Sequence, residues 1–225
     1  MKVLIVLAHP EPHSFNAAMA HAARESLTKA GHEVDVTDLY AMDFDPRSSR
    51  ASFLGASDPA FFKPQAEEAH ASETGGFAPE IEAEIRKLEA CDLMIWQFPL
   101  WWFGAPAILK GWVDRVFVMG RVYGGPKVYA GGLKRGARAV LSLTTGGPTA
   151  AYEPGGFNGA LEGILKPIHR GMLQFIGFDV LAPQVVFGPA RLTDGEREAA
   201  LDAWRRRLET IFDEAPIAVG DYQAG

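Results

Sequence analysis

Three short segments of the chain combine aromatic, hydroxyl-bearing and glycine residues in patterns that suit a flat, anionic ligand. The most informative is residues 97–112 (QFPLWWFGAPAILKGW), in which three consecutive aromatic residues lie between Pro99 and Gly104. Pro106 then stands near the start of a predicted helix, where its missing N–H costs least. A loop of this kind can offer apolar surface and free backbone N–H groups together.

The second segment, residues 9–16 (HPEPHSFN), follows a predicted strand. Ser14 and Asn16 stand at a helix start, where a hydroxyl and free N–H groups can hold a phosphate, although a plain N-cap is an equal alternative. His9 at the strand end is a candidate phosphate donor. The spacing of His9 and His13 would suit two metal ligands, but the intervening prolines prevent a continuous helix and no third ligand stands out. We therefore expect no metal site.

The third segment is Thr144-Thr145-Gly146-Gly147. The glycines let the backbone approach a ligand closely, and the threonine hydroxyls can bond a polar ring edge, although a tight turn would need the same residues. No G-x-G-x-x-G follows the first predicted strand, which disfavours a tightly held NAD. Together the segments predict a flavin, with its phosphate on residues 9–16 and its ring edge on residues 97–112 and 144–147. The aromatic residues would stack a nicotinamide or quinone on the ring.

The elements that must position these segments alternate between strands and helices, which predicts a doubly wound parallel sheet with helices on both faces. In such sheets ligands bind beyond the carboxyl ends of the strands, where all three segments begin. We expect strands over 2–8, 33–38, 92–97, 137–144 and 178–187, and helices over 16–29, 79–90, 106–118, 158–176 (bent at Pro167) and 194–212.

The size and composition of the chain bound its class. A length of 225 residues predicts one domain, over 1–215, with a short C-terminal tail over 216–225. The long stretch 40–79 contains several prolines and glycines, and connections of this length are usually functional or mobile. The net charge of −6 argues against nucleic acid or an anionic membrane surface as a partner. The short apolar runs and the single cysteine predict a cytoplasmic protein without membrane insertion.

Several motifs resemble the NAD(P)H:quinone oxidoreductases of DT-diaphorase type, in the flavodoxin-like superfamily. The similarity runs nearly end to end, and the sixteen-residue motif is highly specific. It is carried by L-I-V-L-A-H (4–9), S-F-N (14–16), D-L-Y-A-M (38–42), Q-F-P-L-x-W-F-G-x-P-A-I-L-K-G-W (97–112), R-V-F (115–117), T-T-G-G (144–147) and G-F-x-V-L-x-P-Q (177–184).

This resemblance implies a flavodoxin-like three-layer sandwich with a five-stranded parallel sheet in the order 2-1-3-4-5. It also implies a homodimer with an FAD in each of two sites at the subunit interface. NAD(P)H and then the quinone would use the same pocket in turn, which is a ping-pong two-electron reduction. NADH and NADPH are both possible reductants, and FMN is the alternative cofactor.

By matching positions, the resemblance also assigns site residues. The candidate catalytic residues are Tyr152 and Asn158. The candidate cofactor-binding residues are His9, Ser14, Phe15, Asn16, Pro99, Leu100, Trp101, Trp102, Phe103, Thr144, Thr145, Gly146, Gly147, Tyr152 and Arg197. The candidate substrate-binding residues are Trp102, Phe103, Tyr123, Phe175 and Phe178.

Four positions depart from the family pattern. Asn158 stands where the family has a histidine that is thought to relay a proton beside the tyrosine, and an amide cannot carry a proton at neutral pH. Gly125 replaces a pocket tyrosine, Lys63 a glutamine that faces the FAD, and Trp101 a glutamine in the long motif. We expect flavin binding and hydride transfer to survive, and the preference for donor and acceptor to shift.

Two other classes of function remain open at this stage. One is a flavodoxin-type electron carrier or regulatory flavoprotein without turnover of its own. The other is an NAD(P)H-dependent FMN reductase that acts on nitro or azo compounds. The aromatic loop and the long 40–79 stretch favour an enzyme, because a carrier tends to keep its flavin edge free for a protein partner.

Overall fold

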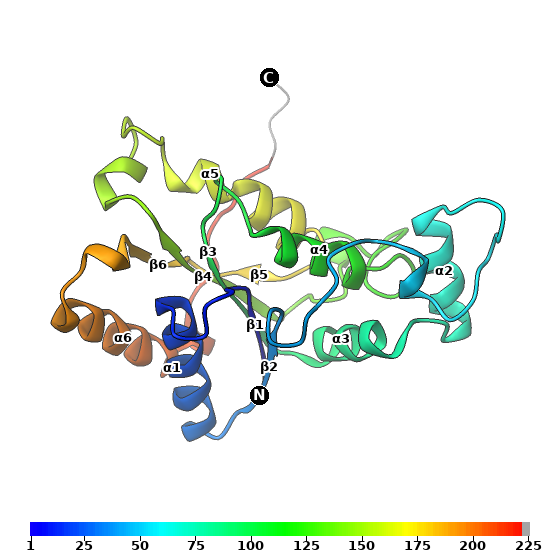
Figure 1. Ribbon diagram of the computed structural model, residues 1–225, viewed down its shortest axis with the longest axis horizontal. Coiled ribbons are helices and arrows are strands. Elements are labelled where there is room, and N and C mark those ends of the chain that lie inside the picture. The colour runs from blue at the N-terminus through cyan, green and yellow to red at the C-terminus, as the bar shows by residue number, and fades with distance from the viewer. Residues whose placement is uncertain (222–225) are drawn as a thin grey trace.

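A parallel β-sheet lies between two layers of helices in the computed structural model, which describes residues 1–221 (Figure 1). Neighbouring strands follow the order β2-β1-β3-β4-β5, and β6 also pairs with β4. The predicted order and the flavodoxin-like α/β class are therefore confirmed. The strands are β1 (Lys2–Leu7), β2 (Glu33–Asp38), β3 (Leu93–Pro99), β4 (Arg138–Thr145), β5 (Asp179–Val180) and β6 (Gln184–Phe187).

Helices cover both faces of this sheet. On one face lie α1 (Phe15–Lys29) and α6 (Asp194–Leu208), and on the other lie α3 (Pro79–Ala90), α4 (Ala107–Val116) and α5 (Leu161–Ile168). Helix α2 (Pro64–Thr74) stands at the periphery (Figure 1). The short segments are η1 (Arg50–Ser52), η2 (Tyr129–Gly131), η3 (Thr149–Tyr152), the π-helix η4 (His169–Gln174), η5 (Pro189–Arg191) and η6 (Ile211–Asp213).

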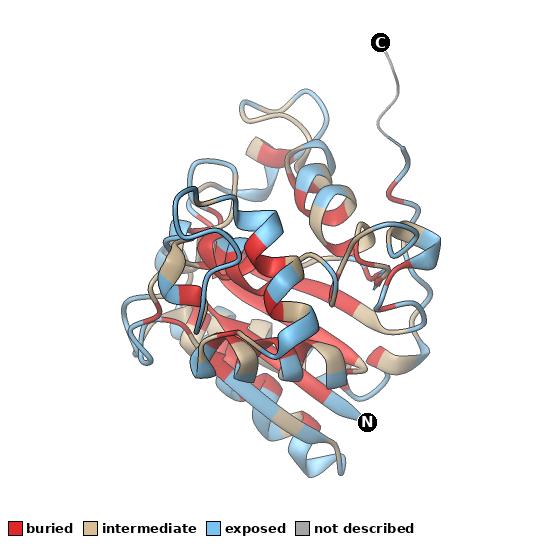
Figure 2. Cartoon of the chain, turned by 90° about the vertical axis from the view of Figure 1, so that its right-hand side faces the viewer, coloured by how far each residue is buried: buried red, intermediate tan, exposed pale blue. Residues whose placement is uncertain are grey.

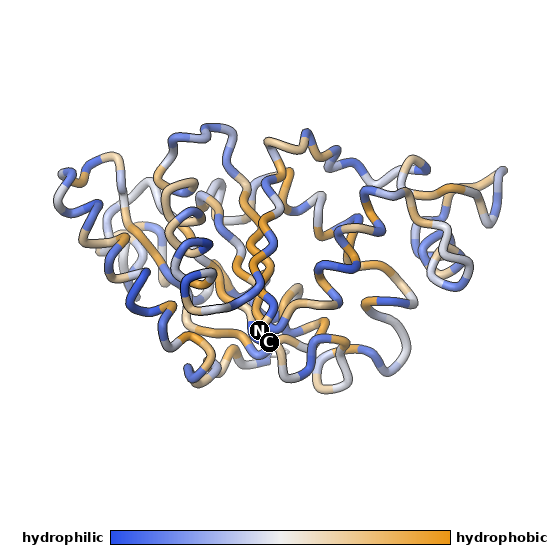
Figure 3. The backbone as a smooth tube through the Cα atoms, turned by 90° about the horizontal axis from the view of Figure 1, so that it is seen from below, coloured by the Kyte–Doolittle hydropathy of each residue, from blue (hydrophilic) through white to orange (hydrophobic). Residues whose placement is uncertain are grey.

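The core consists of two layers because the central strands are buried on both sides. Along β1, Val3 and Ile5 pack towards α1 and α6, whereas Leu4 and Val6 pack towards α3 and α4. Successive side chains of a strand point to opposite faces of the sheet. An apolar run without polar alternation, as in β1, is therefore buried on both faces. Figure 2 shows the buried strands in the centre of the molecule. In Figure 3 the apolar residues are concentrated along these central strands, between the helices.

Two elements differ from the prediction because of prolines. The expected strand over 178–187 is divided into β5 and β6, and Pro183 in the gap cannot donate to the ladder. The expected helix over 158–176 begins only at Leu161 and continues after Pro167 as the π-helix η4. Proline removes a helical hydrogen bond and crowds the preceding turn, which favours such a change of register.

The stretch 40–79 is more ordered than its composition suggests. It contains α2, which the sequence reading did not identify, and it is fastened to the domain by Arg115 of α4. The buried Arg115 guanidinium donates to the Asp45 carbonyl (2.6 Å) and to Ser52 Oγ (3.0 Å), and it pairs with Glu80 (2.8 Å). At the other end of the chain, the Ile217 N–H donates to the Val180 carbonyl. Residues 222–225 of the predicted tail 216–225 lie outside the described residues.

Candidate functional site

Three loops meet at the carboxyl edge of the sheet, as predicted. The loop after β1 is tied to β3 because the Ala8 N–H donates to the Gln97 carbonyl (2.9 Å). The loop after β3 is tied to β4 because the Leu100 N–H donates to the Thr144 carbonyl (2.8 Å). These bonds continue the pairing of β1, β3 and β4 beyond the regular strands. The loops are thus held side by side as one surface.

The loop after β1 presents donors suited to an anion. Ser14 is the N-cap of α1, and its Oγ accepts from the Ala17 N–H (3.1 Å), which leaves the N–H groups of Phe15 and Asn16 free of intrahelical partners. The Glu11 N–H donates to His9 Nδ1 (3.0 Å), and Nε2 is the ring nitrogen left to donate to a ligand. Free N–H groups at a helix start and an imidazole donor form a suitable cradle for a phosphate.

A buried chain of amides and a hydroxyl lies beneath the loops. Asn16 Nδ2 donates to Thr144 Oγ1 (2.9 Å), and Asn16 Oδ1 accepts from Gln97 Nε2 (2.9 Å). All three side chains are buried, and Gln97 Oε1 has no hydrogen-bond partner within residues 1–221. The Asn16 and Thr144 side chains therefore face the protein interior and align the loops. The sequence reading missed Gln97, although it is an isolated polar residue in an apolar strand.

The aromatic loop forms a tight hairpin with a strained backbone. Trp101 and Gly104 exchange two backbone hydrogen bonds (3.1 and 2.9 Å), with Trp102 and Phe103 at the turn. Both central residues have positive φ, +50° and +58°. A two-residue hairpin of this kind normally uses Asn-Gly, because side chains with a Cβ rarely adopt positive φ. Strain of this kind is concentrated at functional sites.

Within this hairpin the aromatic side chains point outwards. Trp102 is 98% exposed and Phe103 51% exposed, whereas Leu100 is buried beneath them with Pro99. The Trp101 ring lies 6.2 Å from the His9 ring, which connects the hairpin to the first loop. The Trp102 ring on this strained turn gains almost nothing from the fold, so we infer that it faces a ligand together with the half-exposed Phe103.

The loop after β4 brings Tyr152 against the glycine pair. The Tyr152 ring lies so close to Gly147 that an added Cβ there would approach the ring to 3.1 Å, whereas nothing lies within 4 Å of a Cβ on Gly146. Tyr152 is buried and packs on Phe187, with the ring centroids 5.8 Å apart. A side chain at Gly147 would therefore crowd the Tyr152 ring, and Gly146 opens the surface towards a ligand.

Asn158 belongs to the same loop as Tyr152. Its backbone N–H donates to the Ala151 carbonyl (2.8 Å), next to Tyr152, and the side chain is half-buried. In the described part of the chain, the two side chains share no hydrogen bond. On the neighbouring turn, Thr145 Oγ1 donates to the Gly147 carbonyl (2.8 Å) and Arg191 donates to the Gly146 carbonyl (2.6 Å). The loop is thus fixed through its backbone carbonyls, which accept from one backbone N–H and from the Thr145 and Arg191 side chains.

The candidate substrate residues do not all lie together. Tyr123 and Phe175 pack with their ring centroids 5.8 Å apart and line a cavity of about 370 Å³, which includes no residue of the three loops. Burial raises the pKa of the Tyr123 hydroxyl, which accepts from Gln65 Nε2 (3.2 Å). Phe178 is buried elsewhere, with the Lys134 ammonium 5.6 Å from its ring centre. Within one chain, Tyr123 and Phe175 therefore line a different cavity from the surface that carries Trp102 and Phe103.

Arg197 is committed to the turn before α6. Its guanidinium donates to the Leu192 carbonyl (2.5 Å) and pairs with Asp194. Beside the first loop, however, a cavity of about 530 Å³ extends along α1 and α6 and is lined by Ser14, Arg24 and Arg205. The sequence reading missed these two arginines. The sequence could have indicated them, because both are basic and lie on the helices that face each other next to the phosphate cradle.

Two further properties follow from the described residues. Within residues 1–221, no three His, Cys, Asp or Glu side chains are grouped in a way that could hold a metal ion. No helix in that range is both long and apolar enough to cross a membrane.

Comparison with known proteins gives a consistent result. The sequence pattern of a family described by its flavodoxin-like fold matches residues 1–210. NAD(P)H dehydrogenase [quinone] 1 of Cavia porcellus is 47% identical over 217 residues, which cover 96% of this chain and 79% of the relative. Ribosyldihydronicotinamide dehydrogenase [quinone] of Pongo abelii is 45% identical, with 96% and 94% covered. A Klebsiella pneumoniae protein assigned as a quinone reductase has a crystal structure that superimposes with a TM-score of 0.92 at 40% identity, covering 96% of this chain and 87% of that one.

Proposed function

This chain belongs to the flavodoxin-like fold family, in its group of NAD(P)H dehydrogenases (quinone), and we propose that it is a flavoprotein that reduces quinones with NAD(P)H. The observation that carries the proposal is the strained Trp102–Phe103 hairpin beside the anion cradle of α1. The relatives named for quinone reduction support the same reaction class.

The residues of the three loops fit a flavin. The free N–H groups of Phe15 and Asn16 and the Nε2–H of His9 would bind its phosphate. The open surface at Gly146 would admit the ring edge, and Trp102 and Phe103 would cover the ring. A bound flavin would supply hydride transfer from NAD(P)H to the quinone in a ping-pong sequence. The protein's own contribution is orientation, because stacked rings need close and fixed contact.

Tyr152 is the chain's candidate for proton handling near the ring edge. Its position over Gly147 places the phenol beside the open surface of Gly146, where a hydroxyl can donate a hydrogen bond. Asn158 on the same loop can donate a hydrogen bond but cannot deliver a proton at neutral pH. We therefore expect the reaction to depend on Tyr152 and solvent for its proton.

FAD is the cofactor that we propose in preference to FMN. The cavity along α1 and α6 continues from Ser14 past Arg24 and Arg205, and FMN would end at the phosphate. An adenylate group would meet apolar surface and the charge of Arg24 there, whereas Arg205 is already paired with Glu198 and Asp202. The mass of the cofactor released by heat tests this choice, because FAD and FMN differ by the whole adenylate. Recovery of FMN alone would contradict it.

A homodimer with two equal sites is the second part of the proposal. Tyr123 and Phe175 line their own surface groove, apart from Trp102 and Phe103, so one chain does not complete a closed substrate pocket. A second copy could bring the two sets together. Light scattering during size exclusion tests this: a mass near twice 24.4 kDa supports the dimer, and a monomer with full activity contradicts it.

We also propose that the protein works in the cytoplasm. Its cysteine, Cys91, is a buried thiol whose pKa is raised to about 11 by burial, and it would remain reduced there. Cell fractionation with the native chain tests this location.

The test of the activity is the consumption of NADPH and NADH, each measured with and without 1,4-benzoquinone. Quinone-dependent consumption by the wild-type chain, together with its loss in the W102A/F103A variant, supports the proposal. Equal rates with and without the quinone would contradict it. A nitroaromatic acceptor measured in parallel tests the alternative acceptor class.

A further inference from the structure

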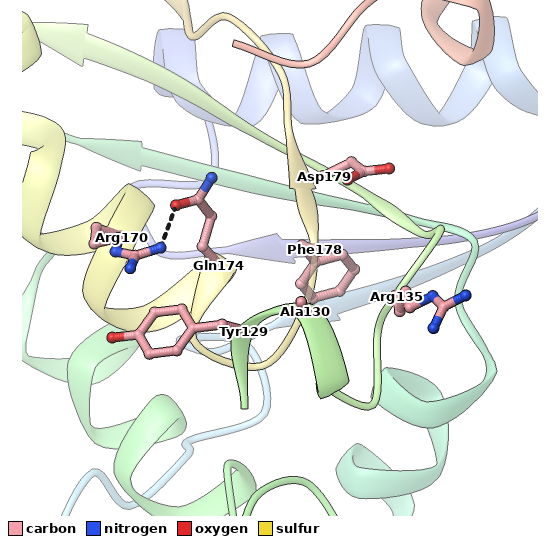
Figure 4. A pocket seen from close by; sticks show the side chains of 8 residues that line it. Tyr129, Ala130, Arg135, Arg170, Gln174, Phe178 and Asp179 are labelled. Carbon is pink, nitrogen blue, oxygen red and sulfur yellow. Dashed lines mark hydrogen bonds between the residues drawn. The ribbon is translucent and has the colours of Figure 1, made fainter. Parts of the chain in front are cut away.

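A separate cavity of about 390 Å³ lies at the end of the sheet where β4 and β5 begin, opposite to the three loops (Figure 4). Its volume falls in the range of small-molecule sites. The residues that give it chemical character are Arg170 and Gln174 on the π-helix η4, Tyr129, Arg135 and Phe178. None of the three loops contributes to it.

Arg170 offers a hydrogen-bonding edge that is only half used. Its Nη2 pairs with Asp221 Oδ1 (2.6 Å) and its Nη1 donates to Gln174 Oε1 (3.3 Å). Its Nε is buried and has no partner among residues 1–221. Nε and Nη2 of arginine together bind one carboxylate side-on, as Arg207 does with Glu214 in this protein (2.8 Å for each bond). Arg170 therefore has one donor of such a pair unsatisfied.

The position of Arg170 is fixed by its neighbours. Its guanidinium lies 4.0 Å from the centre of the Tyr129 ring, and Tyr129 in turn packs edge-on against Phe175 (5.4 Å). The Tyr129 backbone has φ +48° and its N–H donates to the Phe175 carbonyl (2.8 Å). Figure 4 shows Arg170 and Gln174 turned towards each other above the Tyr129 ring. A preorganised guanidinium loses little freedom when it binds an anion.

The remainder of the cavity determines the class of ligand. Ala130 and the buried Phe178 contribute apolar surface, and the exposed Arg135 makes no side-chain hydrogen bond or ion pair within residues 1–221. Asp179 supplies a negative charge on the same lining. Arg170 and Arg135 thus stand against two carboxylates, Asp179 on the lining and Asp221 on Arg170, and this small net charge favours a monoanion over a phosphate dianion.

We propose that this cavity binds a small organic carboxylate, with its charged end on Nε and Nη2 of Arg170 and its apolar body against Ala130 and Phe178. The side chain of Asp221 shows that Arg170 accepts a carboxylate, and Asp221 is 80% exposed, so this pair is weak and exchangeable. The free ligand and Asp221 compete for the same nitrogen.

The experiment uses the flavin-loaded protein and 4-fluorobenzoate, observed by ¹⁹F NMR, with 4-fluorobenzamide as its neutral counterpart. Benzoate should bind at least about tenfold more tightly than benzamide, because a charge-assisted bidentate pair exceeds 1.4 kcal/mol. Arg170→Gln should abolish that preference. Asp221→Asn should preserve or tighten binding, by up to about fivefold, since exposed ion pairs contribute at most about 1 kcal/mol.

Two further variants keep the test decisive. Arg170→Lys retains the charge but not the two coplanar donors, so it should weaken benzoate binding even if Arg170→Gln does not fold. W102A/F103A should bind benzoate as the wild type does, because the loops lie at the other end of the sheet. Equal binding of benzoate and benzamide would overturn the proposal. So would unchanged affinity in Arg170→Lys, weaker binding in Asp221→Asn, or loss of binding in W102A/F103A.

Discussion

Replacing Trp102-Phe103 by Asn-Gly should stabilise the fold and remove the activity. The two residues occupy the centre of a two-residue hairpin with φ of +50° and +58°. Asparagine and glycine adopt these angles with little strain, and they are the preferred pair in such turns. The aromatic residues should therefore be less stable in the fold than the pair that replaces them.

The size of the effect follows from three contributions. Two residues in the left-handed region cost roughly 1–2 kcal/mol each, so relief is roughly 2–4 kcal/mol. Trp102 is 98% exposed and loses almost no burial, whereas the half-exposed Phe103 gives up about 1 kcal/mol of apolar contact. The added glycine costs roughly 0.5–1 kcal/mol of chain entropy. The net gain lies between about 0 and 2.5 kcal/mol, with its centre near 1 kcal/mol, which is a rise in Tm of about 2–4 °C for a domain of this size.

The assay is thermal and urea unfolding of the flavin-free chain, with W102A/F103A as the matched control. Alanine also removes the rings but keeps a Cβ at positive φ, so this control should show no stabilisation. Both variants should lose quinone reduction by on the order of tenfold or more, because ring stacking is lost. An Asn-Gly variant no more stable than the Ala-Ala variant would refute the argument from strain, and one with full turnover would refute the role of the rings.

Three other changes test further parts of the account. Asn16→Ala should cost about 2 kcal/mol in urea unfolding and reduce flavin retention, because Gln97 Nε2 and Thr144 Oγ1 lose their buried partner, whereas Ser26→Ala, away from the loops, should do neither. Asn158→His should raise the turnover of quinones sharply if a proton relay is limiting, and an unchanged kcat would show that Tyr152 and the backbone suffice. Burial lowers the pKa of His169 from 6.5 to about 4, so the unfolded chain binds this proton first and stability falls as the pH drops from 6.5 to 4. The loss is roughly 3 kcal/mol, and it should be absent in His169→Phe; a variant with the same pH dependence of unfolding as the wild type would contradict this.

The sequence predicted the sheet and the meeting of its loops because both depend on local patterns. The apolar runs around Ile5, Ile95 and Leu141 have no polar alternation, and only strands covered on both faces tolerate this. Once the strands are parallel, their carboxyl ends share an edge by topology alone. The bond from Leu100 to Thr144 is a direct consequence of that arrangement.

Two features of the site could not be read from the sequence because they depend on distant contacts. The chain Gln97–Asn16–Thr144 joins residues that are 81 and 128 positions apart. The strained angles of Trp102 and Phe103 follow from the two bonds that close the hairpin, since their residue types argue against positive φ.

Helix α2 shows a different reason for failure. Its sequence PQAEEAHASET has no apolar stripe, because α2 lies at the periphery, and periodicity therefore gave no signal. Pro64 at its start and Gly75 in the left-handed conformation at its end were signals that the sequence did contain.

The most direct test of the central claim is a pair of anaerobic stopped-flow experiments on the flavin-loaded protein. NADPH or NADH should bleach the flavin absorbance in the first experiment. A quinone alone should restore the absorbance of the reduced protein in the second, without nicotinamide present. Failure of both nicotinamides to bleach the flavin would contradict the assignment as an NAD(P)H-dependent quinone reductase and favour an electron carrier.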